Sequence, residues 1–163
     1  MAAEELREEY RQARKKALRL LEHMDRTERG LTERLIRGGF SADAASDAVS
    51  WVKELGYVND TRYAENYISA RIHGRSRQKI FQELYRKGVD RTSAAAAWEE
   101  ISFLEQPDER EMIRTEILKK YDQGTELSEK EMRRLLGRFA RRGFRAEDIS
   151  AVLDELDITT VFH

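Results

Sequence analysis

Basic side chains are concentrated in a short stretch near the middle of the sequence, where they could bind an anion. The stretch contains Arg71, His73, Arg75, Arg77 and Lys79. The whole chain of 163 residues has a net charge of only -1, so this positive charge is local. Guanidinium and ammonium groups bind carboxylates and phosphates. The stretch therefore indicates contact with an acidic surface, and the near-neutral total argues against a protein that coats nucleic acid indiscriminately.

A second basic segment runs from Met132 to Ala146 and contains six arginines and no acidic residue. Helical spacing predicts a buried apolar stripe of Met132, Leu135, Leu136 and Phe139. It leaves a different face to Arg134, Arg138 and Arg141. Like charges this close on one helix repel each other, so something must compensate them. The sequence leaves two alternatives open: an acidic or phosphate-bearing partner, or the chain's own carboxylates from neighbouring helices.

Polar and phenolic residues that could suggest catalysis are better explained by structure. We interpret Asn59 and Asp60 as helix caps and Tyr63 as a packing residue. Arg62 and Arg71 could instead join neighbouring helical modules through buried carboxylates. Trp51 and Trp98 are expected to pack in the core or between modules rather than to stack on bases.

No cofactor, metal site or enzymatic activity is expected from the sequence. It has no cysteine, no Gly-Lys-Ser/Thr phosphate loop and no convincing Ser-His-Asp set. The histidines, His23, His73 and His163, lack the spacing of metal ligands. The N-terminus has early acids and no apolar run, which does not fit a targeting peptide, so we expect a cytoplasmic chain.

An internal repeat organises the sequence. Three Gly-apolar pairs, Gly39-Phe40, Gly88-Val89 and Gly143-Phe144, share the same flanking apolar positions. Five residues before the second member of each pair lie Leu35, Leu84 and Phe139, and nine residues before it lie Leu31, Ile80 and Leu135. Matching positions on the other side are Ala45, Ala94 and Ile149, then Val49, Trp98 and Leu153, then Val52, Ile101 and Leu156. These spacings predict two short amphipathic helices in each unit, broken at a glycine.

Start signals support these breaks. Predicted N-caps are Ser41, Ser76, Asp90 and Ser128, the last in a capping box with Glu131. A further helix precedes each pair, over Ala17 to Met24, Asp60 to Ile72 and Asp108 to Tyr121, and the third unit has an insertion around residues 122–125.

The sequence thus predicts an all-α fold of three tandem three-helix repeats, stacked into an elongated, curved array. The expected boundaries are an N-terminal helical extension over 1–15, repeat 1 over 16–58, repeat 2 over 59–106, and repeat 3 with a C-terminal tail over 107–163. Such small modules cannot each bury a large core, so stacking must contribute to their stability.

Most of the chain resembles the RecX regulatory proteins. The resemblance is carried by Asp25-Arg26-Thr27-Glu28, by Gly56-Tyr57-Val58-Asn59-Asp60 with Arg62-Tyr63-Ala64, and by Glu83-Leu84 with Lys87-Gly88-Val89. Val58-Asn59 stands where the family usually has Leu-Asp, and Asn59 can still cap a helix.

This resemblance implies a non-enzymatic modulator that binds RecA and the RecA–single-stranded DNA filament and inhibits its recombinase, ATPase and co-protease activities. We expect the chain to be a monomer. We expect contact with RecA or DNA through basic faces that comprise Arg71, Arg75, Arg77, Lys79, Arg86, Lys87, Arg134, Arg138, Arg141 and Arg142. The alternatives are a helical-repeat protein that binds DNA directly and a general solenoid adaptor.

Overall fold

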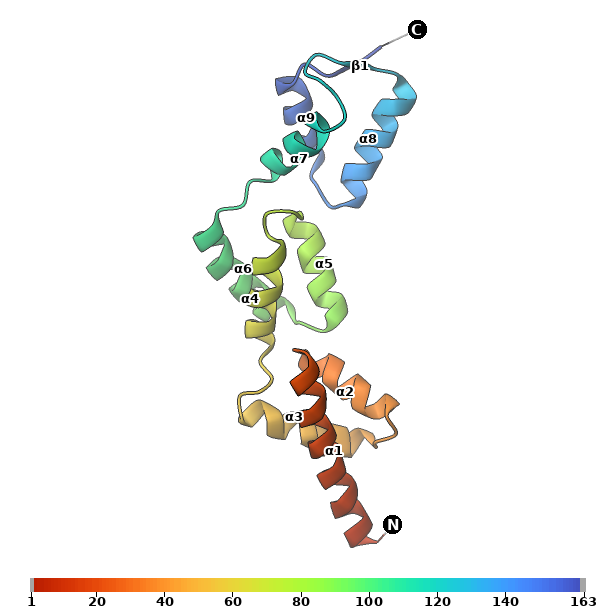
Figure 1. The fold of residues 1–163 in the computed structure, drawn as a ribbon, viewed down its shortest axis with the longest axis vertical. Helices are drawn as coiled ribbons and strands as arrows, with labels where there is room; N and C mark the ends of the chain where they lie inside the picture. The colour runs from red at the N-terminus through yellow and green to blue at the C-terminus, as the bar shows by residue number, and fades with distance from the viewer. Residues whose placement is uncertain (1, 162–163) are drawn as a thin grey trace. The chain divides into compact units, whose positions relative to one another are not determined.

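The computed structural model describes residues 2–161, and the regular secondary structure of this part of the chain is almost all helix (Figure 1). Its helices are α1 (Ala3–His23), α2 (Glu28–Arg37), α3 (Ala42–Glu54), α4 (Asp60–Arg71), α5 (Arg77–Lys87), α6 (Arg91–Glu105), α7 (Glu109–Leu118), α8 (Glu129–Arg141) and α9 (Ala146–Glu155). The predicted all-α class and the three successive groups of three helices are confirmed.

Contacts divide the chain into two compact units. The first unit consists of Met1–Tyr67 and Glu83–Glu100, and the second of Ile68–Gln82 and Ile101–His163. Helices α4, α5 and α6 each contribute residues to both units. The repeat boundaries at 58/59 and 106/107, and the elongation and curvature of the array, stay predictions.

The core of the first unit lies between α1, α2 and α3. Its centre is fully buried and includes Ala13, Ala17, Leu31 and Leu35, with Trp51 packed against it. Small alanines on α1 allow α3 to pack closely against it. The predicted first helix, Ala17 to Met24, is too short: it and the predicted extension form one helix from Ala3, because no glycine or proline interrupts this segment.

The core of the second unit joins α7, α8 and α9. Phe139 on α8 is fully buried, and its ring meets that of Phe144 edge to face at a centroid distance of 5.8 Å. The unit also contains two short strands that are not among the predicted elements, β1 (Glu126–Leu127) and β2 (Thr159–Thr160), which pair in parallel. The predicted insertion at 122–125 leads into β1.

Local signals fixed the helix ends as expected. The glycines of the three repeat motifs have left-handed φ angles of 101°, 103° and 87° at Gly39, Gly88 and Gly143. After each glycine, the N–H of the apolar residue donates to a carbonyl five residues earlier, at distances of 3.0 to 3.2 Å for Phe40, Val89 and Phe144. This is the Schellman arrangement that glycine permits.

The predicted helix caps are mostly confirmed, with one correction. Side chains that each accept a hydrogen bond from the N–H three residues later are Ser41, Asn59, Ser76, Asp90 and Ser128. Asp60, in contrast, accepts from the N–H of Glu28 at 2.9 Å. Its carboxylate caps α2, which the sequence could not show because the two residues are far apart in the chain.

Candidate basic interface

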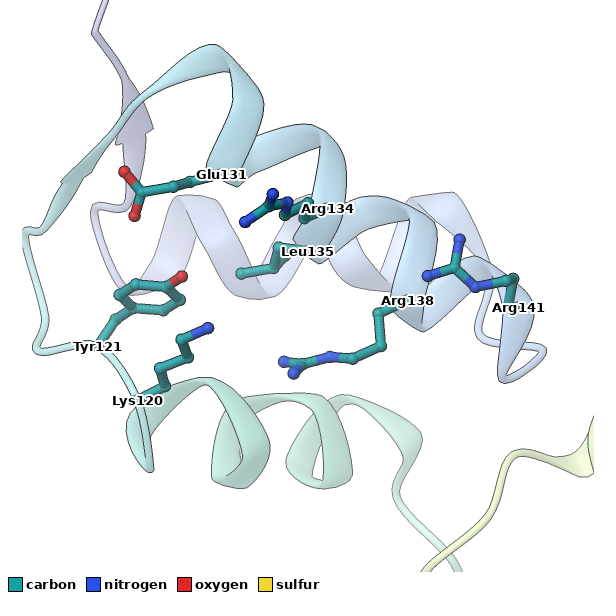
Figure 2. A pocket seen from close by; sticks show the side chains of 7 residues that line it. All are labelled: Lys120, Tyr121, Glu131, Arg134, Leu135, Arg138 and Arg141. Atoms are coloured by element: carbon teal, nitrogen blue, oxygen red, sulfur yellow. The ribbon is translucent and has the colours of Figure 1, made fainter.

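A basic groove in the second unit lies alongside α8 (Figure 2). It has a volume of about 580 Å³ and is lined by Lys120, Tyr121, Glu131, Arg134, Leu135, Arg138 and Arg141. Lys120 follows the end of α7, and its side chain and that of Arg138 extend into the space between the two helices (Figure 2). Four of the seven lining side chains are cationic and one is acidic.

The amphipathic pattern of α8 positions these arginines. Leu135 and Phe139 are buried and anchor the helix on the core, which turns Arg134, Arg138 and Arg141 outward. The prediction of a buried apolar stripe is wrong for one residue, because Leu136 is 39% exposed. Three apolar positions are enough to hold one side of this short helix, so Leu136 lies at the edge of the stripe.

The arginines of α7 show what internal neutralisation looks like in this chain. Arg114 donates two hydrogen bonds to the carboxylate of Glu155, at 2.6 Å and 3.0 Å, and the Nε of Arg110 lies 2.9 Å from the Oδ1 of Asp148. The hydrogen bond from Arg110 is the main reason why the pKa of Asp148 is lowered. Acidic residues of α9 therefore compensate the basic residues of α7.

The outward arginines of α8 are not compensated in this way. Within the described residues, no carboxylate lies within 4.0 Å of the guanidinium groups of Arg134, Arg138 or Arg141. The one groove acid, Glu131, accepts a hydrogen bond from Ser128 at 3.1 Å. In the part of the chain that the structure describes, these three arginines therefore form no ion pair with the chain's own carboxylates, and cationic side chains outnumber the acid in the groove.

Arg142 differs from its neighbours on α8. Its Nη1 lies 3.6 Å from a carboxylate oxygen of Glu116, and its guanidinium group lies 5.8 Å and 5.5 Å from the ring centres of Phe139 and Phe144. These contacts hold Arg142 over the core of the second unit. Arg142, which directly follows α8, is therefore less available to a partner than Arg134, Arg138 and Arg141, which are exposed.

The second unit brings the two basic segments of the sequence together. The hydroxyl of Ser76, which precedes α5, donates to the carbonyl of Arg142 at 2.7 Å. A Cβ on Gly143 would lie only 3.1 Å from the backbone nitrogen of Lys79. The start of α5, with Arg77 and Lys79, therefore lies against the end of α8. Spacing along the chain gives no indication of this proximity.

The remaining expected contact residues are divided between the two units. Arg71 is half-buried and Arg75 is exposed, and the guanidinium carbon of Arg77 lies 4.4 Å from the ring centre of Phe81. Arg86 and Lys87 belong to the first unit, where Lys87 lies 5.6 Å from the ring centre of Tyr67. The α8 groove does not include them.

The side chains that could have suggested chemistry have structural contacts. The ring of Tyr63 stacks on Tyr67 at a centroid distance of 6.3 Å, and Arg62 donates to the carbonyl of Gly56 at 3.2 Å. In the described part of the chain, no three His, Asp or Glu side chains are grouped so that they could hold a metal ion. His163 lies outside the described residues. No helix between residues 2 and 161 is long and apolar enough to cross a membrane.

Comparison with known proteins identifies the family. Two family models match the chain: "RecX, first three-helix domain" over residues 13–51 and "RecX, second three-helix domain" over residues 59–97. A regulatory protein RecX from Caldanaerobacter subterraneus subsp. tengcongensis is 31% identical over 147 residues, which cover 90% of this chain and 71% of the relative. The chain belongs to the RecX family. A RecX protein from Streptomyces coelicolor is 35% identical over 141 residues, covering 85% of this chain and 73% of the relative.

Solved RecX structures support the fold. The crystal structure of RecX from Lactobacillus salivarius matches with a TM-score of 0.71 at 21% identity, covering 92% of this chain and 97% of that one. A second crystal structure of a regulatory protein RecX matches with a TM-score of 0.73 at 16% identity, covering 90% and 73%. At these identities, the likeness concerns the fold alone.

Proposed function

We propose that this RecX chain binds RecA and the RecA–single-stranded DNA filament and inhibits the recombinase, ATPase and co-protease activities. Its membership of a family of regulatory proteins supports this function. In this proposal the chain acts in the cytoplasm as a monomer, by contact and without catalysis or a cofactor.

The observation that carries the proposed interface is the uncompensated charge of Arg134, Arg138 and Arg141 along one groove. Guanidinium groups that lack an internal carboxylate are available to form paired hydrogen bonds with carboxylates or phosphates of a partner. The basic start of α5, which lies against the end of α8, extends this surface. Arg86 and Lys87 would provide a separate contact from the first unit.

Direct binding of a DNA strand is the second candidate, favoured by the lining of the groove. Tyr121 and Leu135 provide apolar surface between the cationic side chains. Aromatic surface beside a basic track is the usual combination for a single strand, because bases stack while phosphates pair with cations. The two functions are compatible, since a RecA filament contains DNA as well as protein.

The decisive experiment measures the single-stranded DNA-dependent ATPase of RecA while the chain is titrated in. Changing Arg134, Arg138 and Arg141 together to Glu should raise the half-inhibitory concentration by about tenfold or more, because like charges then face the partner. A second triple variant, Arg77→Glu, Lys79→Glu and Arg86→Glu, tests the expected contact residues of α5 in the same way.

A matched control separates the groove from the overall charge. Arg7, Lys15 and Arg19 are exposed on α1, and reversing all three gives the same change in net charge at residues that do not line the groove. This control should inhibit as the wild type does, and circular dichroism should show that all variants are folded. Unchanged inhibition by both test variants would remove the basic faces from the mechanism, and a wild-type chain that leaves RecA activity unaffected would overturn the proposed function.

A further inference from the structure

The same buried hydroxyl contact occurs at two places in the chain. In the first unit, Thr27 accepts from the N–H of Gly30 at 3.0 Å and donates to the carbonyl of Lys87 at 2.6 Å. In the second unit, Ser76 accepts from the N–H of Lys79 at 3.1 Å and donates to the carbonyl of Arg142. Thr27 is 3% exposed and Ser76 is 0% exposed. Each hydroxyl thus caps the second helix of one group and ties it to the second helix of the next.

A carboxylate completes each contact. Asp60, the first residue of α4, accepts from the N–H of Glu28 at 2.9 Å, and Glu109, the first residue of α7, accepts from the N–H of Arg77 at 2.9 Å. The N–H groups in the first turn of a helix have no partner within the helix. In both cases the next three-helix group provides the partner.

Glycine allows the close approach at both places. A Cβ on Gly88 would lie 2.6 Å from the Cβ of Arg29, and one on Gly143 would lie 2.6 Å from the hydroxyl of Ser76. Gly39 ends α2 in the same Schellman geometry, yet nothing lies within 4 Å of its Cβ position. The close approach therefore belongs to the contact between helix groups and is not a general property of this helix ending.

Ser128 supports the same distinction. It caps α8 through the N–H of Glu131, as Ser76 caps α5, but its hydroxyl donates to the side chain of Glu131 in its own helix. It is also exposed. A serine at a helix start in this chain therefore does not by itself make the contact that Thr27 and Ser76 make.

We propose that Ser76 is a positioning residue for the basic interface, and that Thr27 has the equivalent role in the first unit. The Ser76 hydroxyl fixes the first turn of α5, with Arg77 and Lys79, against the end of α8, so that two segments far apart in the sequence present one surface. This inference rests on the proposed function for its activity measurement only, because the geometry can be tested separately.

Amide hydrogen exchange, resolved by nuclear magnetic resonance, tests the contact itself. Ser76→Ala should accelerate exchange at Arg77 and Lys79 by about tenfold or more relative to the wild type. The N–H of Lys79 loses the hydroxyl that accepts its hydrogen bond, and the N–H of Arg77, which donates to Glu109, lies in a helix turn that is no longer held against the end of α8. Ser128→Ala also removes a helix cap, and it should leave exchange at these two amides within about twofold of the wild type. Equal acceleration by the two variants would overturn the contact between the helix groups.

Activity and rescue test the positioning role. Ser76→Ala should raise the half-inhibitory concentration for RecA ATPase by about fivefold to tenfold, whereas Ser76→Thr, the residue found at the equivalent Thr27, should restore it to within about twofold. Glu109→Ala removes the carboxylate that accepts a hydrogen bond from the N–H of Arg77. Because Glu109 is only half-buried, this variant replaces Ser76→Ala in the experiment if Ser76→Ala does not fold. Faster exchange with unchanged inhibition would overturn the positioning role. If the wild type does not inhibit RecA, the proposed function fails and the exchange experiment still decides the contact.

Discussion

The hydroxyl oxygen of Ser76 lies 2.7 Å from the carbonyl oxygen of Arg142, although 66 residues separate them in the sequence. The bond joins the residue just before α5 to the residue just after α8 inside the second unit. A buried hydroxyl that both caps a helix and satisfies a carbonyl at another helix end leaves neither group unpaired. This contact turns two basic segments into neighbours.

A pair of glycine substitutions measures how closely the two helix ends approach. Gly143→Ala should cost about 1 to 2 kcal/mol for the left-handed backbone, and more because its Cβ would meet Ser76 and Lys79. Gly39→Ala incurs only the backbone cost, since its Cβ position is open. Urea unfolding of both variants checks this, and equal losses of stability would show that the approach at Gly143 is not tight.

The salt dependence of binding to free single-stranded DNA tests the second candidate function. The affinity is measured by fluorescence anisotropy. Its logarithm should fall linearly with the logarithm of the salt concentration, because binding releases the cations that are condensed on the phosphates. Replacing Arg134, Arg138 and Arg141 by Ala should reduce the slope by about one for each arginine that contacts a phosphate. The control variant Arg7→Ala, Lys15→Ala and Arg19→Ala should keep the wild-type slope. Equal slopes for all three proteins would exclude DNA from the groove.

Stability in acid should depend on Asp148. Its pKa is lowered from the ordinary value of 3.8, mainly by the hydrogen bond from Arg110 and to a smaller extent by the charge of Arg145. The folded chain therefore binds this proton less tightly than the unfolded chain does. The stabilisation is complete above the unfolded pKa and is lost as the pH falls through the lower, folded pKa.

The corresponding variant is Asp148→Asn. It should lower the free energy of unfolding at pH 7 by about 1 to 2 kcal/mol, a value kept small because the side chain of Arg110 is half-exposed. The difference from the wild type should shrink below about pH 4. Urea unfolding between pH 7 and pH 3 checks this, and a difference that stays constant across the range would contradict the ion pair as its source.

Burial of Leu84 distinguishes the core of α5 from its solvent-facing side. Leu84 is 0% exposed, so Leu84→Asp places a charge in an apolar interior and should cost about 4 kcal/mol or more. Gln82→Asp introduces the same side chain two positions earlier at an exposed site and should cost less than about 1 kcal/mol. Circular dichroism during thermal unfolding compares the two, and similar melting temperatures would show that Leu84 is not a core position.

Most of the helical pattern could be predicted because its causes are local. The repeat positions at Leu31, Ile80 and Leu135, and those at Leu35, Leu84 and Phe139, are all buried. Helical spacing alone placed them on one face. Phe40 and Trp98 are partial exceptions among the repeat positions, since both are only half-buried. The parallel pairing of Glu126 with Thr159 could not be predicted, because two-residue strands leave no periodic signal.

For the candidate interface, too, one part could be predicted from the sequence and another part could not. The sequence by itself determined where the helices begin and end and which arginines face outward from α8, since caps, glycines and apolar spacing act within a few residues. Only the tertiary structure decided that Glu155 and Asp148 pair with the arginines of α7, and that Ser76 meets Arg142. It also decided that Arg134, Arg138 and Arg141 have no ion pair among residues 2–161. Ion pairs and hydrogen bonds between distant segments depend on how helices pack in space, and the order of residues along one helix does not record that.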